Sequence, residues 1–210
     1  MTKEKVLSSY LGDEYVKDVF SNIYARNDWE NPESRSGRCA TVEATERVRQ
    51  QLPALLKKLG VKSMLDAPCG DFNWMQHTEL DVDNYIGADI VPDVIKRNQE
   101  LYSRSGREFS RLDITKDEIP TVDLIFCRDC LIHLSLHYMG EAIANFKKSK
   151  SKYLLTTTYT SHPKNSDIRT GDCRFINLQT APFNLPAPIE LIVEEPETSK
   201  SMALWLLDEL

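Results

Sequence analysis

The sequence lacks the long apolar runs that mark membrane and exported proteins. No stretch of about 18 apolar residues occurs, and acidic residues stand near the start, where a secretory signal would be apolar. We therefore expect no membrane partner and a cytoplasmic protein. The tetrapeptide LDEL at 207–210 resembles an endoplasmic-reticulum retrieval signal, but such a signal has no effect on a chain that never enters that compartment.

An excess of positive charge is also missing. The chain has 26 Lys and Arg against 32 Asp and Glu, a net charge of −6, and no block of like charge. A nucleic-acid partner is therefore not expected, because the positive field that grips a phosphate backbone is absent. The cysteines, five in all, form no even-numbered disulfide framework, and we expect free thiols at Cys39, Cys69, Cys127, Cys130 and Cys173.

The length and composition are those of one folded unit. The 210 residues include 41% hydrophobic and 28% charged residues, and no repeat of fixed period is visible. From 41 onward, short apolar runs alternate with amphipathic stretches, which predicts parallel βαβ units. We expect helices at 41–59, 91–102 and 136–149, strands at 61–67, 84–90, 107–113, 121–127 and 152–158, and a closing antiparallel hairpin at 189–195 and 201–207.

The strand ends of such a sheet are where ligands bind. Asp66 closes the first run, Gly70 permits a tight turn, and Asp71 follows it. Asp89 closes the next run near the distance from Gly70 at which an acidic residue binds a ribose. The single glycine lies between carboxylates, which would repel a diphosphate, and no Gly-Lys-Ser/Thr follows any strand. A cationic nucleoside without phosphates is therefore favoured.

Five segments in this order resemble the core of class I S-adenosylmethionine-dependent methyltransferases: LDAPCGD, YIGADI, RLDIT, DLIFCRDCLIHL and YLLTTT. The likeness covers roughly 36–160. The wider string, including IYARNDWENPESRSG and RFINLQTAPFNLPAP, is similar to a bacterial and viral group, some of whose members are thought to methylate sugar hydroxyls in glycans.

The resemblance implies an α/β Rossmann-like fold, with a seven-stranded, mostly parallel sheet whose last strand is antiparallel. It also implies S-adenosylmethionine as cofactor and S-adenosylhomocysteine as product. Asp66 and Gly70 would meet the methionine part, with Asp71 beside them. Asp89 would bind the ribose and Ile90 would pack on the adenine, and Asp113, with Ile114 next to it, would accept the adenine amino group. The family's glycine-rich turn is reduced here to APCGD, with Pro68 and Cys69 inside it.

Methyl transfer needs chiefly alignment of the reacting atoms, but a neutral hydroxyl acceptor also needs a base. Asp129 and His133 stand four apart after the fourth strand, so a helical turn would put both on one face. We predict His133 as base and Asp129 as its orienting group or a second base. A packed histidine with Asp129 as helix N-cap is the alternative. Arg128 either binds the cofactor or substrate or pairs with Asp129.

Two other interpretations concern Cys127, Cys130, His133 and His137, which have the spacing C-x2-C-x2-H-x3-H. A zinc site is disfavoured because Cys127 ends an apolar run and the two halves stand too close for a finger loop. A redox dithiol at Cys127 and Cys130 is disfavoured because the rest of the chain carries nucleoside signals. We expect no required metal.

Two polar segments outside the core are candidates for the remaining contacts. Residues 1–40 are predicted to form a helical cap and a cofactor-covering loop, with 41–210 as the methyltransferase domain. The loop's candidate cofactor ligands are Trp29, Ser36, Gly37 and Arg38, although an ordinary surface loop is an equal alternative. The polar, Pro-rich stretch 161–188 supplies the acceptor-binding candidates Asn165, Asp167, Arg174 and Asn177.

The predicted activity is methylation of a sugar, glycan or small-molecule hydroxyl. An N-methyltransferase or one acting on protein side chains is the alternative enzyme, for which base catalysis matters less. A third interpretation is a cofactor-binding interaction module without catalysis.

Overall fold

Seven strands form one sheet, in the order β3-β2-β1-β4-β5-β7-β6, in the computed structural model, which describes residues 14–210. Neighbouring strands are parallel except at β7, which runs antiparallel to both β5 and β6. This confirms the predicted sheet and its closing hairpin. The strands are β1 (Ser63–Asp66), β2 (Asn84–Asp89), β3 (Arg107–Arg111), β4 (Leu124–Cys127), β5 (Tyr153–Tyr159), β6 (Glu190–Glu195) and β7 (Lys200–Leu206).

The described residues also form helices α2 (Tyr15–Arg26), α3 (Glu46–Leu59), α4 (Pro92–Tyr102) and α5 (Leu136–Lys148). Their ends follow local chemistry. Gly60 ends α3 in the left-handed region at φ 66°, where a glycine meets no steric penalty. Pro92 occupies the first turn of α4, and the Ser135 hydroxyl caps α5 by accepting a bond from the Tyr138 N–H.

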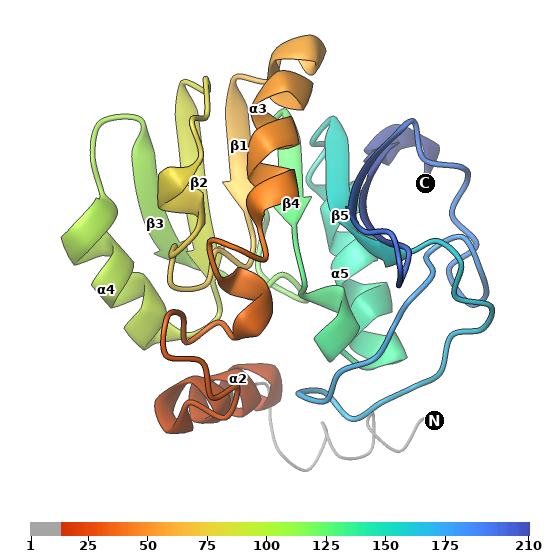
Figure 1. Ribbon diagram of the computed structural model, residues 1–210, viewed down its shortest axis with the longest axis horizontal. Coiled ribbons are helices and arrows are strands. Elements are labelled where there is room, and N and C mark those ends of the chain that lie inside the picture. Colours follow the sequence, from red (N-terminus) through yellow and green to blue (C-terminus); the bar gives the residue numbers. More distant parts are fainter. Residues whose placement is uncertain (1–13) are drawn as a thin grey trace.

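Each face of the sheet buries its own apolar cluster. Met64 and Leu65 are adjacent in β1 and enter opposite clusters, because successive side chains of a strand point to opposite faces. This is why the central strands read as continuous apolar runs. Helix α3 packs in the cluster with Met64 and α5 in the cluster with Leu65, so the two helices cover opposite faces (Figure 1).

Helix α2 lies at the edge where the parallel strands end. In Figure 1 the arrowheads of β1 and β4 point toward it. Its residues Tyr15 and Val16 join the cluster of α5, with the Tyr15 ring 6.2 Å from that of Tyr138. The part of the predicted cap at 1–13 lies outside the described residues. The division of the chain into a cap at 1–40 and a methyltransferase domain at 41–210 stays a prediction.

The chain between β5 and β6, residues 160–189, forms turns and irregular segments without a helix or strand. It is fixed against the hairpin partly by Trp205 of β7, whose indole N–H donates to the Pro186 carbonyl at 2.9 Å. None of the helices between 14 and 210 has the length and apolar character needed to cross a membrane.

Candidate functional site at the strand ends

Three buried carboxylates mark the ends of neighbouring strands. Asp66 is the last residue of β1, Asp89 the last of β2, and Asp113 lies just after β3. Burial raises the pKa of Asp66 to about 7 and that of Asp89 to about 6. Since a buried anion without a cation is costly, this edge is prepared for a positively charged or hydrogen-bond-donating group.

Asp89 joins the turn after β1 to the end of β2. Its Oδ2 accepts the Gly70 N–H at 3.1 Å and its Oδ1 accepts the Val91 N–H at 2.9 Å. Each carboxylate oxygen has a second lone pair, so Asp89 can still accept two hydroxyl protons, such as those of a ribose. Gly70 has φ 52°, which gives the reduced turn its shape with a single glycine.

Asp66 and Asp113 each have local partners. The hydroxyl of Tyr85 donates to Asp66. Asp113 Oδ1 accepts the N–H of Thr115 at 3.0 Å and its hydroxyl at 2.6 Å, so the carboxylate stabilises the turn that follows it. Ile114 is buried and Ile90 is half-buried against the same apolar cluster, which gives the site an apolar wall beside Asp113.

Asp71 anchors the preceding loop. Its carboxylate accepts the Ser34 hydroxyl at 2.9 Å and the Arg35 N–H at 2.9 Å, and its own N–H donates to the Ser36 hydroxyl at 3.1 Å. The sequence does not reveal this role of Asp71, for which the resemblance implies a place beside the methionine part of the cofactor. The contact brings the predicted covering loop onto the glycine turn, where a Cβ on Gly70 would lie 2.3 Å from the Ser36 hydroxyl oxygen.

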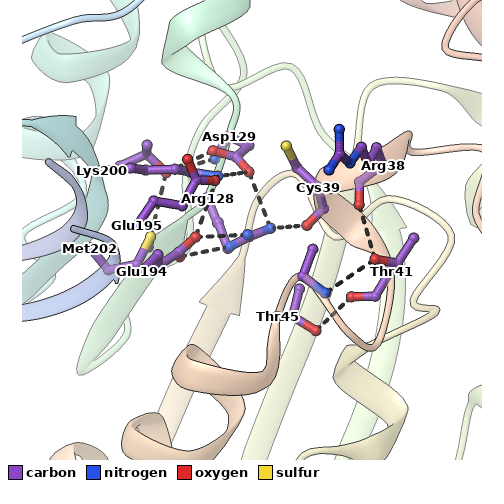
Figure 2. Close-up of polar contacts among 12 residues, drawn as sticks. Arg38, Cys39, Thr41, Thr45, Arg128, Asp129, Glu194, Glu195, Lys200 and Met202 are labelled. Atoms are coloured by element: carbon purple, nitrogen blue, oxygen red, sulfur yellow. Dashed lines mark hydrogen bonds and ion pairs between the residues drawn. The ribbon is translucent and has the colours of Figure 1, made fainter. Parts of the chain in front are cut away.

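The same loop brings Trp29 to His133. Their rings lie 5.4 Å apart at 36°. Gly37 has φ 90°, and a Cβ there would lie 3.2 Å from the Trp29 Cβ, so a larger residue at this position would crowd the Trp29 side chain. Arg38 is exposed, and its carbonyl accepts the Thr41 N–H and hydroxyl (Figure 2).

His133 ends a short 3-10 turn, Leu131–His133, just after β4. Its Nδ1 lies 2.9 Å from the carbonyl oxygen of Asp172. A carbonyl only accepts, so Nδ1 carries the proton and Nε2 keeps a free lone pair in the neutral ring. Burial lowers the pKa of His133, although the Asp172 bond and the Asp129 charge act in the opposite direction.

The expected pairing of Asp129 with His133 on one helical face is wrong. Asp129 has φ 50°, outside any helix, and the turn begins only after it. The Asp172 carbonyl orients the imidazole instead. Asp129 Oδ2 contacts Lys200 Nζ at 2.8 Å and an Arg128 nitrogen at 3.2 Å (Figure 2). The Asp129 N–H donates to the Thr157 hydroxyl at 2.9 Å.

Arg128 is bonded to other groups of the protein, although its charge also acts at the strand ends, where it opposes the rise of the Asp66 pKa. Direct binding of the cofactor by Arg128 stays a prediction. Arg128 forms a two-bonded pair with Glu194 of β6, at 2.8 Å for each bond, and donates to the Cys39 carbonyl at 2.9 Å. Its guanidinium also lies over the Trp74 ring, 5.5 Å from the centroid. The structure contains the pairing of Arg128 with Asp129, which is the alternative expected from the sequence.

The four acceptor-binding candidates form bonds mainly to main chain. Asn165 and Asn177 are buried and fasten the segment between β5 and β6 to itself. Asp167 accepts the Leu136 N–H at 2.8 Å, at the start of α5, and Arg174 donates to the Ile132 carbonyl at 2.8 Å. These contacts hold the segment beside His133. Direct binding of an acceptor by the four side chains stays a prediction.

Cys127 is buried and Cys130 is partly exposed after β4. A hydrogen bond with Cys127, together with burial, raises the pKa of Cys130 well above its ordinary value, which keeps that thiol protonated. Over residues 14–210, no three His, Cys, Asp or Glu side chains are grouped so that they could hold a metal ion.

Sequence reasoning missed Asp172, Thr157, Glu194 and Lys200. Asp172 contributes its main-chain carbonyl, and because every residue has one, the residue type gives no signal for this role. Glu194 and Lys200 carried a weak signal, as charged residues within or next to two apolar strands, but these charges suit a solvent-exposed edge equally well.

No protein-family model and no curated protein matches the sequence. Magnesium protoporphyrin IX methyltransferase (ChlM) from Synechocystis PCC 6803, with bound S-adenosylhomocysteine, has TM-score 0.57 at 12% identity over 97% of this chain and 99% of that chain. N-methyltransferase NodS from Bradyrhizobium japonicum WM9 has TM-score 0.57 at 16% identity, over 78% and 96%. The complex of NodS with S-adenosylhomocysteine has TM-score 0.52 at 20% identity, over 66% of this chain and 74% of that chain. The chain therefore has the Rossmann-like fold of the class I methyltransferases, as its strand-end motifs predict.

Proposed function

We propose that the chain is an S-adenosylmethionine-dependent methyltransferase that acts on a hydroxyl of a sugar, glycan or small molecule. The observation that carries the choice of a hydroxyl is the bond between His133 Nδ1 and the Asp172 carbonyl, 2.9 Å long, which leaves Nε2 as a proton acceptor. A neutral hydroxyl is a poor nucleophile, and a fixed base removes its proton as the new bond forms.

The donor set at the strand ends fits this cofactor. When bound, S-adenosylmethionine supplies a methyl group on a sulfonium that needs no further activation. Asp66 offers a carboxylate to the cationic methionine part and Asp89 offers two oxygens to the ribose hydroxyls. Ile90 and Ile114 would pack on the adenine, with Asp113 beside its amino group. Trp29, Ser36, Gly37 and Arg38 belong to the loop that Asp71 holds over this edge.

His133 is suited to act as a base near neutral pH. Because burial lowers the pKa of His133, the ring is largely neutral at pH 7. Asp129 is suited to a different task. Burial raises its pKa, but the charges of Arg128 and Lys200 outweigh burial and lower it below the ordinary value. Asp129 therefore stays ionised, which makes it a weak base and a good hydrogen-bond acceptor.

Methylation of an amine is the second candidate, and the ionised Asp129 is compatible with it, because a carboxylate also accepts a hydrogen bond from the N–H of a neutral amine. The two functions differ in what His133 must do. A hydroxyl requires the base during methyl transfer, whereas an amine that binds as the free base does not.

Two measurements test the proposal. Isothermal titration with S-adenosylhomocysteine should show saturable binding. Labelled S-adenosylmethionine is then offered with methyl glycosides of neutral hexoses and, as matched acceptors, the corresponding 2-amino-2-deoxy glycosides. Label on the neutral glycosides supports O-methylation, and label on the amino nitrogen alone favours the second candidate. Binding without transfer to either panel or to a cell-extract fraction would favour a non-catalytic module, and no binding would reject the cofactor.

A further inference from the structure

Four charged side chains meet at the ends of β4 and β6 and the start of β7, and we call them the buried charge cluster: Arg128, Asp129, Glu194 and Lys200 (Figure 2). Two are cations and two are anions, so these four charges balance. Lys200 also lies 3.7 Å from the carboxylate of Glu195, whose side chain is 39% exposed. The side chains of Lys200 and Glu194 are only 1% and 2% exposed. A buried ion pair is weak evidence for a role in stability, because desolvation offsets its attraction.

The cluster treats its two carboxylates differently. Glu194 receives the bidentate bonds of Arg128 and is fully enclosed. Asp129 is 14% exposed, and both cations reach it through the same oxygen, Oδ2, with Lys200 the nearer at 2.8 Å against 3.2 Å for Arg128. The cations therefore fix one oxygen and leave Oδ1 to other partners.

Oδ1 of Asp129 has a weak partner. The Thr157 hydroxyl lies 3.3 Å from it and also 3.4 Å from the sulfur of Met202, and its single proton can serve only one of them. The Asp129 charge also acts on His133, where it opposes the lowering of the imidazole pKa by burial. Oδ1 is thus an acceptor at the same strand-end edge as the proposed base.

We propose that Lys200 is a positioning residue, which holds Asp129 through Oδ2 so that Oδ1 accepts a hydrogen bond from an O–H or N–H of the acceptor that lies next to the methylated group. The proposal rests on the proposed function and adds a division of labour to it. Asp129 orients the acceptor and keeps its own charge, and His133 takes the proton. Acceptors with a second hydrogen-bond donor beside the methylated hydroxyl, such as the neighbouring hydroxyls of a sugar, fit such a site.

The test variant is Lys200→Met, which keeps the length of the side chain and removes its charge. With the glycoside that the wild type methylates fastest, we expect kcat/KM to fall about 10- to 100-fold, the cost of one misplaced charged hydrogen bond. S-adenosylhomocysteine affinity should stay within about twofold. Lys200→Arg should recover part of the loss. The matched control is Lys58→Met, because Lys58 is 65% exposed in its pair with Glu190.

A double variant separates positioning from charge balance. The double variant Lys200→Met/Glu194→Gln removes one charge of each sign, so the net charge of the four side chains does not change. If Lys200→Met alone does not fold, the double variant serves as the test variant. The same loss of kcat/KM in the double variant supports positioning. Full recovery in the double variant overturns it, as does a Lys200→Met enzyme with the kinetics of Lys58→Met.

A readout without acceptor keeps this proposal distinct from the proposed function. Carbon-13 NMR of aspartate carboxyl groups follows the titration of Asp129, which the spectrum of Asp129→Asn assigns. In Lys200→Met, or in the double variant where that is the one that folds, the titration should move to higher pH, because the charge and hydrogen bond of Lys200 no longer oppose burial and only Arg128 and, more weakly, His133 still do. An unchanged titration of Asp129 overturns the role of Lys200, whether or not any glycoside is methylated. A failure to methylate any glycoside, taken by itself, counts only against the proposed acceptor class.

Discussion

The N–H of Gly70 donates a hydrogen bond of 3.1 Å to Oδ2 of Asp89, and this bond joins the turn after β1 to the end of β2. In Asp89→Asn the charge is lost and one oxygen becomes an amide that cannot accept. We expect the affinity for S-adenosylhomocysteine to fall about 10- to 100-fold, since bonds to a carboxylate are worth about 1.5–3 kcal/mol. Isothermal titration checks this. Asp81→Asn, an exposed carboxylate before β2, is the control, and equal affinity in both variants would count against the ribose role.

Gly70 should not tolerate a side chain. In Gly70→Ala the Cβ would meet the Ser36 hydroxyl oxygen at 2.3 Å, and φ is 52°, a region that costs a non-glycine residue about 1–3 kcal/mol. We expect a loss of that order in the free energy of unfolding, measured with urea, together with weaker binding of S-adenosylhomocysteine. Gly140→Ala is the matched control, because nothing lies within 4 Å of its Cβ in α5, and it should stabilise by about 0.5–1 kcal/mol. Similar effects of the two substitutions would contradict the strain at Gly70.

Asp66 should make the protein less stable as the pH rises. Burial raises its folded-state pKa to about 7, above the ordinary 3.8, so between these values the folded chain holds a proton that the unfolded chain has released. Stability therefore decreases with rising pH across this window and levels off above it. Asp66→Asn lacks the penalty. Relative to the wild type it should gain up to about 4 kcal/mol by pH 8 and little near pH 4, in urea unfolding at several pH values. A difference that stays constant with pH would show that Asp66 is not desolvated as described.

The strand ends were predictable because buried parallel strands are apolar on both faces and stop at a polar residue. Asp66 and Asp89 could be placed from that pattern and from the resemblance. The residues after β4 could not. Asp129 and His133 share a helical face only if a helical turn begins at Asp129, and φ 50° at Asp129 excludes that turn.

The partners of Asp129 and His133 lie far away along the chain. Lys200 is 71 positions from Asp129, and Asp172 is 39 positions from His133. Such contacts depend on the order of strands and on how the segment between β5 and β6 folds back. A single sequence contains no local signal for either. The same holds for Arg128, whose partner Glu194 is 66 positions away.

His133→Gln should separate catalysis from binding. Gln keeps a polar side chain at this position but cannot act as the base, so turnover of the best glycoside should fall about 10²- to 10⁴-fold while the affinity for S-adenosylhomocysteine stays within about twofold. In the wild type, kcat/KM should decline as the pH falls through the His133 pKa, which burial places below its ordinary 6.5, because the protonated ring has no free Nε2 lone pair. This acidic decline should vanish in the variant. His77→Gln, at an exposed position before β2, should behave as the wild type. Undiminished turnover in His133→Gln would remove the base from the mechanism and leave amine methylation as the better account of the site.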